Sequence, residues 1–193
     1  TANTAGGTKN VAIGNYSLDA LTSGDNNVAM GYAALGTNNT GSSNTALGYS
    51  TLFSNTTGEE NTAIGLNALY TNTTANNNTA VGSSALGANS TGAGNVAIGR
   101  AALDANTTAD FNVGIGTAAM GANTEGHSNT AVGSAAAATN TTGDHLTAVG
   151  MNSLNANTTA NDNTAVGYNS MLLNTEGYSN TAIGIYSLRQ NTT

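Results

Sequence analysis

The sequence contains no cysteine, proline or tryptophan, and only three of its 193 residues are basic. Without cysteine the chain has neither a disulfide framework nor a thiolate metal site. Three cations, at Lys9, Arg100 and Arg189, are too few to neutralise a phosphate backbone, so nucleic acid is excluded as the main partner. No apolar run approaches the length of a membrane span, so we expect no membrane insertion by this segment.

Large apolar residues are also scarce, because leucine, isoleucine, valine and phenylalanine together number only 30. The chain instead contains 32 threonines, 31 asparagines and 33 alanines, and its formal net charge is −7. A composition of this kind is typical of disordered chains, because too little apolar surface is available to offset the entropy of ordering. Composition alone therefore argues against a conventional globular core.

One glycine recurs every 17 residues through eleven copies, without an insertion or a deletion. A disordered tract has no reason to keep such a register, and the unit lacks the apolar period of a helix. Its short runs of β-branched residues, separated by glycine and asparagine, indicate strands and turns. The recurring glycines are Gly14, Gly31, Gly48, Gly65, Gly82, Gly99, Gly116, Gly133, Gly150, Gly167 and Gly184.

The period predicts an all-β fold, a parallel β-solenoid of eleven coils of 17 residues each. We number the positions of a coil from the residue four places before the recurring glycine, which is Asn61 in the coil of Gly65. Residues 10–193 form the predicted solenoid domain, and residues 1–9 form a partial or degenerate coil. Because the chain begins on Thr1 and stops within its pattern, we expect it to be a fragment of a longer fibre protein.

Two columns of large apolar residues are predicted to face the interior. They lie at position 4, as in Ile64, and at position 9, as in Leu69, with a turn at Gly65 between them. Asparagine recurs at positions 1 and 12, as in Asn61 and Asn72, where stacked amides can bond between coils.

Position 3 is alanine in every coil except one, as in Ala63. Because neighbouring strand residues alternate between faces, an inward position 4 predicts an outward position 3. A small, apolar outer strip suits close packing of one solenoid against another. Two large side chains per coil also contribute little against the entropy of ordering 17 residues. We therefore expect a homo-oligomer.

The strings N-T-A-I-G at Asn61–Gly65, N-V-A-I-G at Asn95–Gly99 and N-T-A-V-G at Asn163–Gly167 resemble head repeats of trimeric autotransporter adhesins. The whole unit, such as Asn61–Asn77, is also similar to repeats of phage tail fibres and of bacterial surface proteins of that type. The resemblance implies a left-handed β-roll packed as a homotrimer, outside the cell on a bacterial surface or a phage virion. It also implies attachment to a host surface, with a glycan or a protein receptor as partner.

No catalytic motif is present, so we expect no enzyme activity and no cofactor. Stacking of coils is predicted to align Asp110, His127 and Asp144 at position 16, where carboxylate and imidazole are competent ligands for a divalent cation. The simpler interpretation of these residues is a solvated turn with compensating charges, which leaves the chain without a metal site.

Two further sets of side chains are candidates for surface recognition. The tyrosines Tyr32, Tyr49 and Tyr168 lie just after the glycine turn and can stack on sugars, although corner packing or contacts within an oligomer are the favoured explanation. Threonines recur at positions 13 and 14, and Thr57 and Thr108 are examples of the second column. Such a ladder resembles the threonine arrays of ice-binding proteins, while the simpler interpretation is that threonine is a good strand residue.

The sequence thus supports two hypotheses of different classes. The first is an adhesive or structural segment of a trimeric fibre, acting as a rigid rod with many weak contacts. The alternative is a β-solenoid that binds ice or another crystal surface through Thr57, Thr74 and Thr108.

Overall fold

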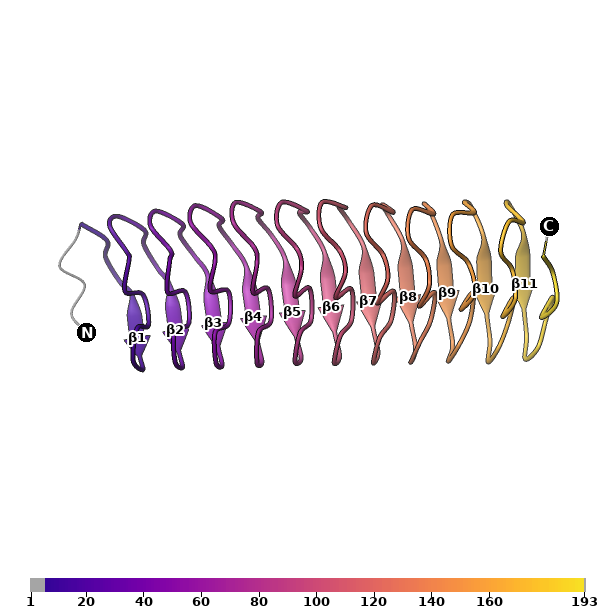
Figure 1. Cartoon of the computed structure of the whole chain (residues 1–193), viewed down its shortest axis with the longest axis horizontal. Helices are drawn as coiled ribbons and strands as arrows, with labels where there is room; N and C mark the ends of the chain where they lie inside the picture. Colours follow the sequence, from indigo (N-terminus) through magenta and orange to yellow (C-terminus); the bar gives the residue numbers. More distant parts are fainter. Residues whose placement is uncertain (1–5, 193) are drawn as a thin grey trace.

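The computed structural model describes residues 6–192 and shows a parallel β-solenoid built from 17-residue coils, as the period predicts. Eleven strands lie side by side in chain order and form one parallel sheet along the rod (Figure 1). At the usual spacing between strands, eleven coils make a rod about 50 Å long. The strands are β1 (Val11–Ile13), β2 (Val28–Met30), β3 (Thr45–Leu47), β4 (Thr62–Ile64), β5 (Thr79–Val81), β6 (Val96–Ile98), β7 (Val113–Ile115), β8 (Thr130–Val132), β9 (Thr147–Val149), β10 (Thr164–Val166) and β11 (Thr181–Ile183).

Every strand pairs with the next at identical repeat positions, as Ala63 does with Ala80. Gly65 directly follows β4 and has a φ of +131°. A Cβ there would lie 2.7 Å from the carbonyl carbon of Gly82 in the next coil. Glycine is therefore required both by the backbone conformation and by the close approach of successive coils. This explains why the glycine column tolerates no substitution in eleven copies.

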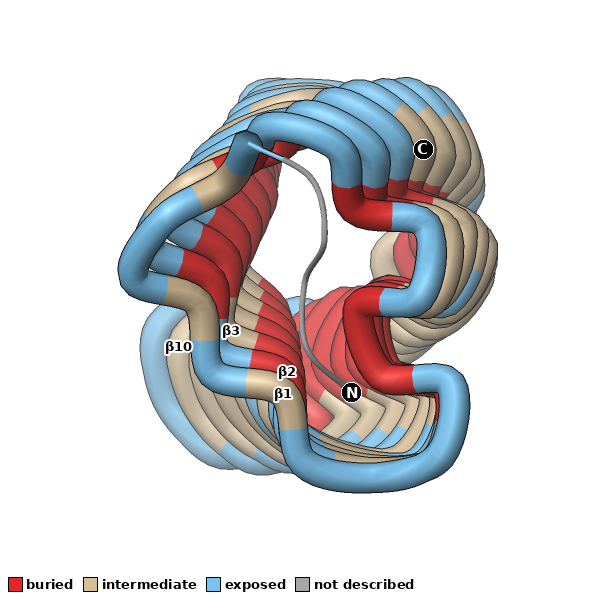
Figure 2. The backbone as a smooth tube through the Cα atoms, turned by 90° about the vertical axis from the view of Figure 1, so that its left-hand side faces the viewer, coloured by how far each residue is buried: buried red, intermediate tan, exposed pale blue. Residues whose placement is uncertain are grey.

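The interior of the rod is lined by position 3, the small residues of position 8 and the leucines of position 9. Leu69 is fully buried, which confirms the predicted inward column at position 9. In the end view, buried residues line the inside of the stack and exposed residues form the outer bends (Figure 2).

The predicted directions of positions 3 and 4 are wrong and must be exchanged. Ala63 is fully buried, whereas Ile64 is 36% exposed, and the same alternation holds along the sheet. Gly114 shows the physical reason, because a Cβ at this position 3 would lie 3.1 Å from Cγ of Leu103 and 3.2 Å from the carbonyl oxygen of Ala119. The inward slot holds nothing larger than a methyl group, so the branched side chain must point outwards.

Two columns of buried asparagines bond the coils together. At position 12, the amide of Asn72 donates to Oδ1 of Asn55 at 2.9 Å and to the carbonyl oxygen of Ala75 at 3.1 Å. At position 1, Oδ1 of Asn61 accepts the backbone N–H of Asn78 at 3.0 Å. Both asparagines are fully buried, so these bonds satisfy amides that would otherwise be costly to desolvate.

Positions 7, 9 and 17 of the coils adopt left-handed backbone conformations, mostly without glycine. In the fourth coil φ is 55° at Asn67, 52° at Leu69 and 61° at Asn77. Asparagine tolerates this region, but leucine does so only at a cost of about 1–2 kcal/mol. The N–H of Leu69 donates to the carbonyl oxygen of Ala85 in the next coil at 3.0 Å, so the stack of coils holds the strained conformation.

The first described residues already follow the pattern of a coil. Thr8 donates its backbone N–H to Oδ1 of Asp25 at 2.6 Å, and its carbonyl oxygen accepts the N–H of Asn26 at 3.1 Å. Residues 1–5 of the predicted partial coil, together with residue 193, lie outside the described residues.

Candidate functional site

The outward surface of the sheet, here called the sheet face, is formed by the side chains at positions 2 and 4 of the strands. Position 2 carries only threonine and valine, and position 4 carries only aliphatic residues and one methionine. Met30 is 40% exposed and Leu47 is 42% exposed, so this column is open to solvent on the single chain. The position 4 column comprises Ile13, Met30, Leu47, Ile64, Val81, Ile98, Ile115, Val132, Val149, Val166 and Ile183.

A second candidate lies around the first three coils and is here called the N-terminal groove. It has a volume of about 470 Å³. Tyr16 and Tyr32 form one corner, because their ring centroids are 5.5 Å apart and their planes lie at 81°. The groove is lined by Tyr16, Asp19, Tyr32, Ala33, Gly36, Thr37, Ser50 and Phe53.

Gly36 lines this groove, and its missing side chain leaves room for the ring of Phe53 beside it. It occupies position 10, between Asp19 in the coil before and Phe53 in the coil after. A Cβ on Gly36 would lie 3.0 Å from Cε2 of Phe53, so the phenylalanine ring fills the space beside the glycine. Asp19, one coil before Gly36, and Phe53, one coil after it, therefore line the same groove.

The same arrangement recurs in reverse order in coils four to six, as a middle groove of about 400 Å³. Tyr70 takes the place of Phe53 and Asp104 supplies the carboxylate, and a Cβ on Gly87 would lie 2.6 Å from Oδ1 of Asp104. Phe53 and Tyr70 stack on each other between the two grooves, with centroids 5.6 Å apart. Partial burial raises the pKa of Asp104, because desolvation disfavours its charged form.

The predicted tyrosines are exposed, but they differ in their surroundings. Tyr32 lines the N-terminal groove, whereas Tyr49 stacks on the far side of Tyr32, with centroids 5.1 Å apart and planes at 10°. Tyr168 meets Tyr186 at the other end of the rod, at 5.5 Å and 74°. There the guanidinium of Arg189 lies 5.3 Å from the Tyr186 ring centroid, in a cation–π contact.

Sequence reasoning did not single out Asp19, Gly36 and Phe53 as residues that line a groove. The available signal was position 10, which reads Asp, Gly, Phe, Tyr, Gly, Asp over the first six coils. Only the stack of coils shows that the glycines of this column make room for the aromatic ring or the carboxylate of the next coil.

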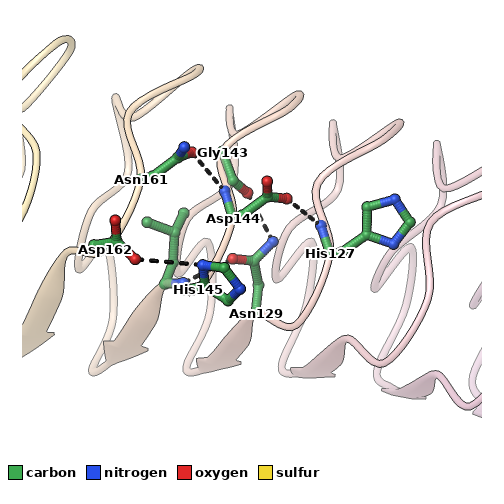
Figure 3. A network of polar contacts seen from close by, with 8 residues as sticks. His127, Asn129, Gly143, Asp144, His145, Asn161 and Asp162 are labelled. Carbon is green, nitrogen blue, oxygen red and sulfur yellow. Dashed lines mark hydrogen bonds and ion pairs between the residues drawn. The ribbon is translucent and has the colours of Figure 1, made fainter.

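The column of Asp110, His127 and Asp144 forms hydrogen bonds to the backbone. The N–H of Asp110 donates to Nδ1 of His127 at 2.9 Å, and the N–H of His127 donates to Oδ1 of Asp144 at 2.7 Å. Asn161 continues the series by accepting the N–H of Asp144 at 2.9 Å (Figure 3). Each of these side chains thus accepts a hydrogen bond from a backbone N–H of the coil before it. Residues 6–192 contain no cluster of three histidine or acidic side chains that could hold a metal ion.

His145 and Asp162 lie beside this column at position 17. Nδ1 of His145 is 3.3 Å from Oδ1 of Asp162, and both side chains are more than half exposed (Figure 3). An exposed pair of this kind contributes little to stability, so its geometry indicates a solvated corner.

The two threonine columns have different roles. At position 13 the hydroxyl groups bond to the next coil, as Thr73 does to the carbonyl oxygen of Ser90 at 3.1 Å. At position 14, Thr57, Thr74 and Thr108 are exposed. The second column therefore presents threonine hydroxyl groups to solvent, with Glu125 and Glu176 as interruptions.

No family model, no curated protein and no solved structure matches the chain. The part of the chain that the structure describes contains no helix long and apolar enough to cross a membrane. The sheet face and the two grooves must therefore be interpreted from their own chemistry, and the chain is identified by its structure as a β-solenoid repeat protein.

Proposed function

We propose that this chain is a rigid segment of a homotrimeric surface or tail fibre, which attaches a bacterium or a phage to another cell. The observation that carries the proposal is the aliphatic column of the sheet face, which continues over all eleven strands without a polar residue. A solvated sheet normally places polar residues on its outer face. Continuous apolar outer residues are typical of a surface that another protein covers.

The energetics favour association through this face. Covering the exposed part of one aliphatic side chain stabilises by about 1–2 kcal/mol, at roughly 25 cal/mol per Å². Over eleven coils the total, on the order of 10–20 kcal/mol, is comparable to or larger than the cost of bringing chains together. Parallel packing of identical rods also matches the straight, regular spacing of the column.

Attachment follows from the shape and repetition of the assembly. A rod about 50 Å long holds its grooves at fixed separations, and three chains present each groove three times. Weak contacts repeated in this way reach an avidity that a single contact lacks. The resemblance of the repeats to adhesin heads and tail fibres supports the same function and an extracellular location, with a surface glycan or a protein receptor as the partner.

The proposal is tested by the mass of the assembly in solution. Light scattering is expected to give three times the chain mass of 18.9 kDa. The double variant Ile64→Lys with Ile98→Lys places two charges on the sheet face and is expected to yield monomers. The matched control, Thr74→Lys with Thr108→Lys, adds the same charges at position 14 and leaves the mass unchanged. A wild-type chain that remains monomeric at all concentrations contradicts the proposal.

The exposed position 14 column keeps a second function open, which is binding to ice or to another crystal surface. Thr57, Thr74 and Thr108 project from equivalent places of their coils. Thermal hysteresis is the measurement that tests this alternative. Hysteresis that disappears in the Thr74→Lys with Thr108→Lys variant, but persists in the sheet-face variant, would replace the fibre proposal.

A further inference from the structure

The N-terminal groove is lined by three aromatic rings and one carboxylate. Tyr16, Tyr32 and Phe53 supply the rings and Asp19 supplies the carboxylate, while Gly36 forms part of the wall. The volume of about 470 Å³ lies in the range of small-molecule sites. We propose that this groove binds a trimethylammonium group, of the kind carried by choline and its esters.

The rings can act on a cation from more than one direction. Tyr16 and Tyr32 are nearly perpendicular, so a group seated in their corner meets two differently oriented aromatic surfaces. Phe53 lines the same groove, with its ring beside Gly36. Aromatic enclosures of this type attract quaternary ammonium ions through the negative potential of the ring faces.

The other end of the rod shows that the scaffold supports such a contact. Arg189 occupies position 10 and its guanidinium lies over Tyr186 at position 7 of the same coil. The first coil has Tyr16 at position 7, but Asp19 at position 10. The chain thus supplies its own cation at one end, whereas the corresponding place at the other end carries a negative charge.

The charge of the groove and of the whole chain favours a cationic ligand. Asp19 is exposed and has no salt bridge among residues 6–192, and the chain carries a formal net charge of −7. A quaternary ammonium suits the lining better than a primary ammonium, because it has no N–H groups that need acceptors. The hydroxyl of Thr37 already donates to the carbonyl oxygen of Phe53 at 2.6 Å, and Ser50 is only 8% exposed.

The middle groove offers an internal comparison. It retains a glycine, Gly87, and the carboxylate of Asp104, but Tyr70 is the only aromatic residue of its lining. With one ring in place of three, the cation–π contribution is smaller. We expect the middle groove to bind the same cation several times more weakly than the N-terminal groove.

The test is a calorimetric or NMR titration of the full chain with choline and with tetramethylammonium. The neutral isostere of choline, in which carbon replaces nitrogen, is the control ligand because it has the same shape without the charge. Saturable binding of both cations is expected, with at least about fivefold weaker binding of the isostere. Equal affinity for the isostere, or no saturable binding of either cation, overturns the proposal.

Matched variants locate the site. Tyr16→Ala and Asp19→Asn are each expected to weaken choline binding by about fivefold or more. Both introduce residues that other coils carry at the same positions, so the coil is expected to remain folded. The controls are Tyr186→Ala and Asp104→Asn, which make the same changes elsewhere and leave the main affinity unchanged. Equal losses in the controls would overturn the assignment to this groove.

Two carriers of the trimethylammonium group distinguish a soluble polymer from a lipid surface as its source. A soluble polymer bearing phosphocholine and a vesicle of phosphatidylcholine are compared for retention of the chain, with Tyr16→Ala as the negative control in each. Retention of the wild-type chain by either carrier supports the proposal and identifies the source. Absence of saturable choline binding by the wild-type chain in the titration overturns the proposal. The inference goes beyond the proposed function and concerns a single chain, so its failure is independent of the mass measured for the assembly.

Discussion

The inward and outward columns of the coil follow different rules, although they alternate along the same strands. The inward Ala63 and Leu69 belong to columns that change little over the rod, because each coil must fit the coil above and below it. Position 10 changes from Asp19 to Gly36 to Phe53 in three successive coils. The comparison shows that the interior fixes the scaffold, while outward residues can vary to build grooves on it.

The largest expected difference between the two sides concerns Leu69 and Ile64. Leu69→Ala opens a cavity in the buried column and is expected to lower the free energy of unfolding by about 2–5 kcal/mol. Ile64→Ala removes an exposed side chain and is expected to cost under about 1 kcal/mol in the monomeric chain. Urea denaturation of both variants, in the Ile98→Lys background that favours monomers, measures the difference. Equal losses would contradict the assigned directions.

The next largest effect concerns the one interruption of the inner asparagine column at position 1. Leu146 replaces asparagine there, so its side chain offers no oxygen to the backbone N–H of Asn163 in the next coil. Leu146→Asn restores this acceptor and is expected to raise the free energy of unfolding by about 1 kcal/mol. Denaturant unfolding of the variant measures the change. The reverse substitution, Asn61→Leu, is the matched control and is expected to destabilise.

A smaller effect is expected at the outward position 7. Ala101 has a φ of 56°, a conformation that glycine adopts with less strain than alanine. Ala101→Gly is therefore expected to stabilise the chain, by about 0.5–1 kcal/mol. Ala102→Gly, at the buried position 8 next to it, is the control and is expected to destabilise. Thermal unfolding of the pair checks the opposite signs.

The smallest effects concern pH and two outward carboxylates whose pKa values move in opposite directions. Hydrogen bonds from the backbone and side chain of Thr8 lower the pKa of Asp25, so its stabilisation is present above pH 3.8 and is lost as pH falls through the lowered value. Burial raises the pKa of Asp104, so its protonated form is favoured below pH 3.8 and this advantage is lost as pH rises through the raised value.

Unfolding measured as a function of pH is expected to separate Asp25→Asn from Asp104→Asn. The first variant loses stability relative to wild type at neutral pH, and the second gains stability there. Both differences are expected to shrink in acid, where the wild-type carboxylates are protonated. The same sign for both variants at neutral pH would contradict the two environments.

Much of the scaffold could be predicted because repetition makes the constraints visible. The period of 17 fixes parallel, in-register stacking, and the unbroken glycine column marks a place where successive coils leave no room for a Cβ. The buried asparagines were recognised for the same reason, since only a ladder between coils explains an amide at Asn72 in nearly every repeat. The left-handed backbone at Leu69 was not foreseen, because leucine gives no local signal for it.

The sequence by itself therefore determined the repeat, the strand and turn order, and the columns of Gly65, Asn72 and Leu69. Only the tertiary structure decided which of Ala63 and Ile64 faces inwards. Alternation along a strand fixes that two apolar neighbours point to opposite sides, but the free volume of the interior selects the side. Tertiary structure also decided the grooves, because side chains two coils apart become neighbours only when the coils stack.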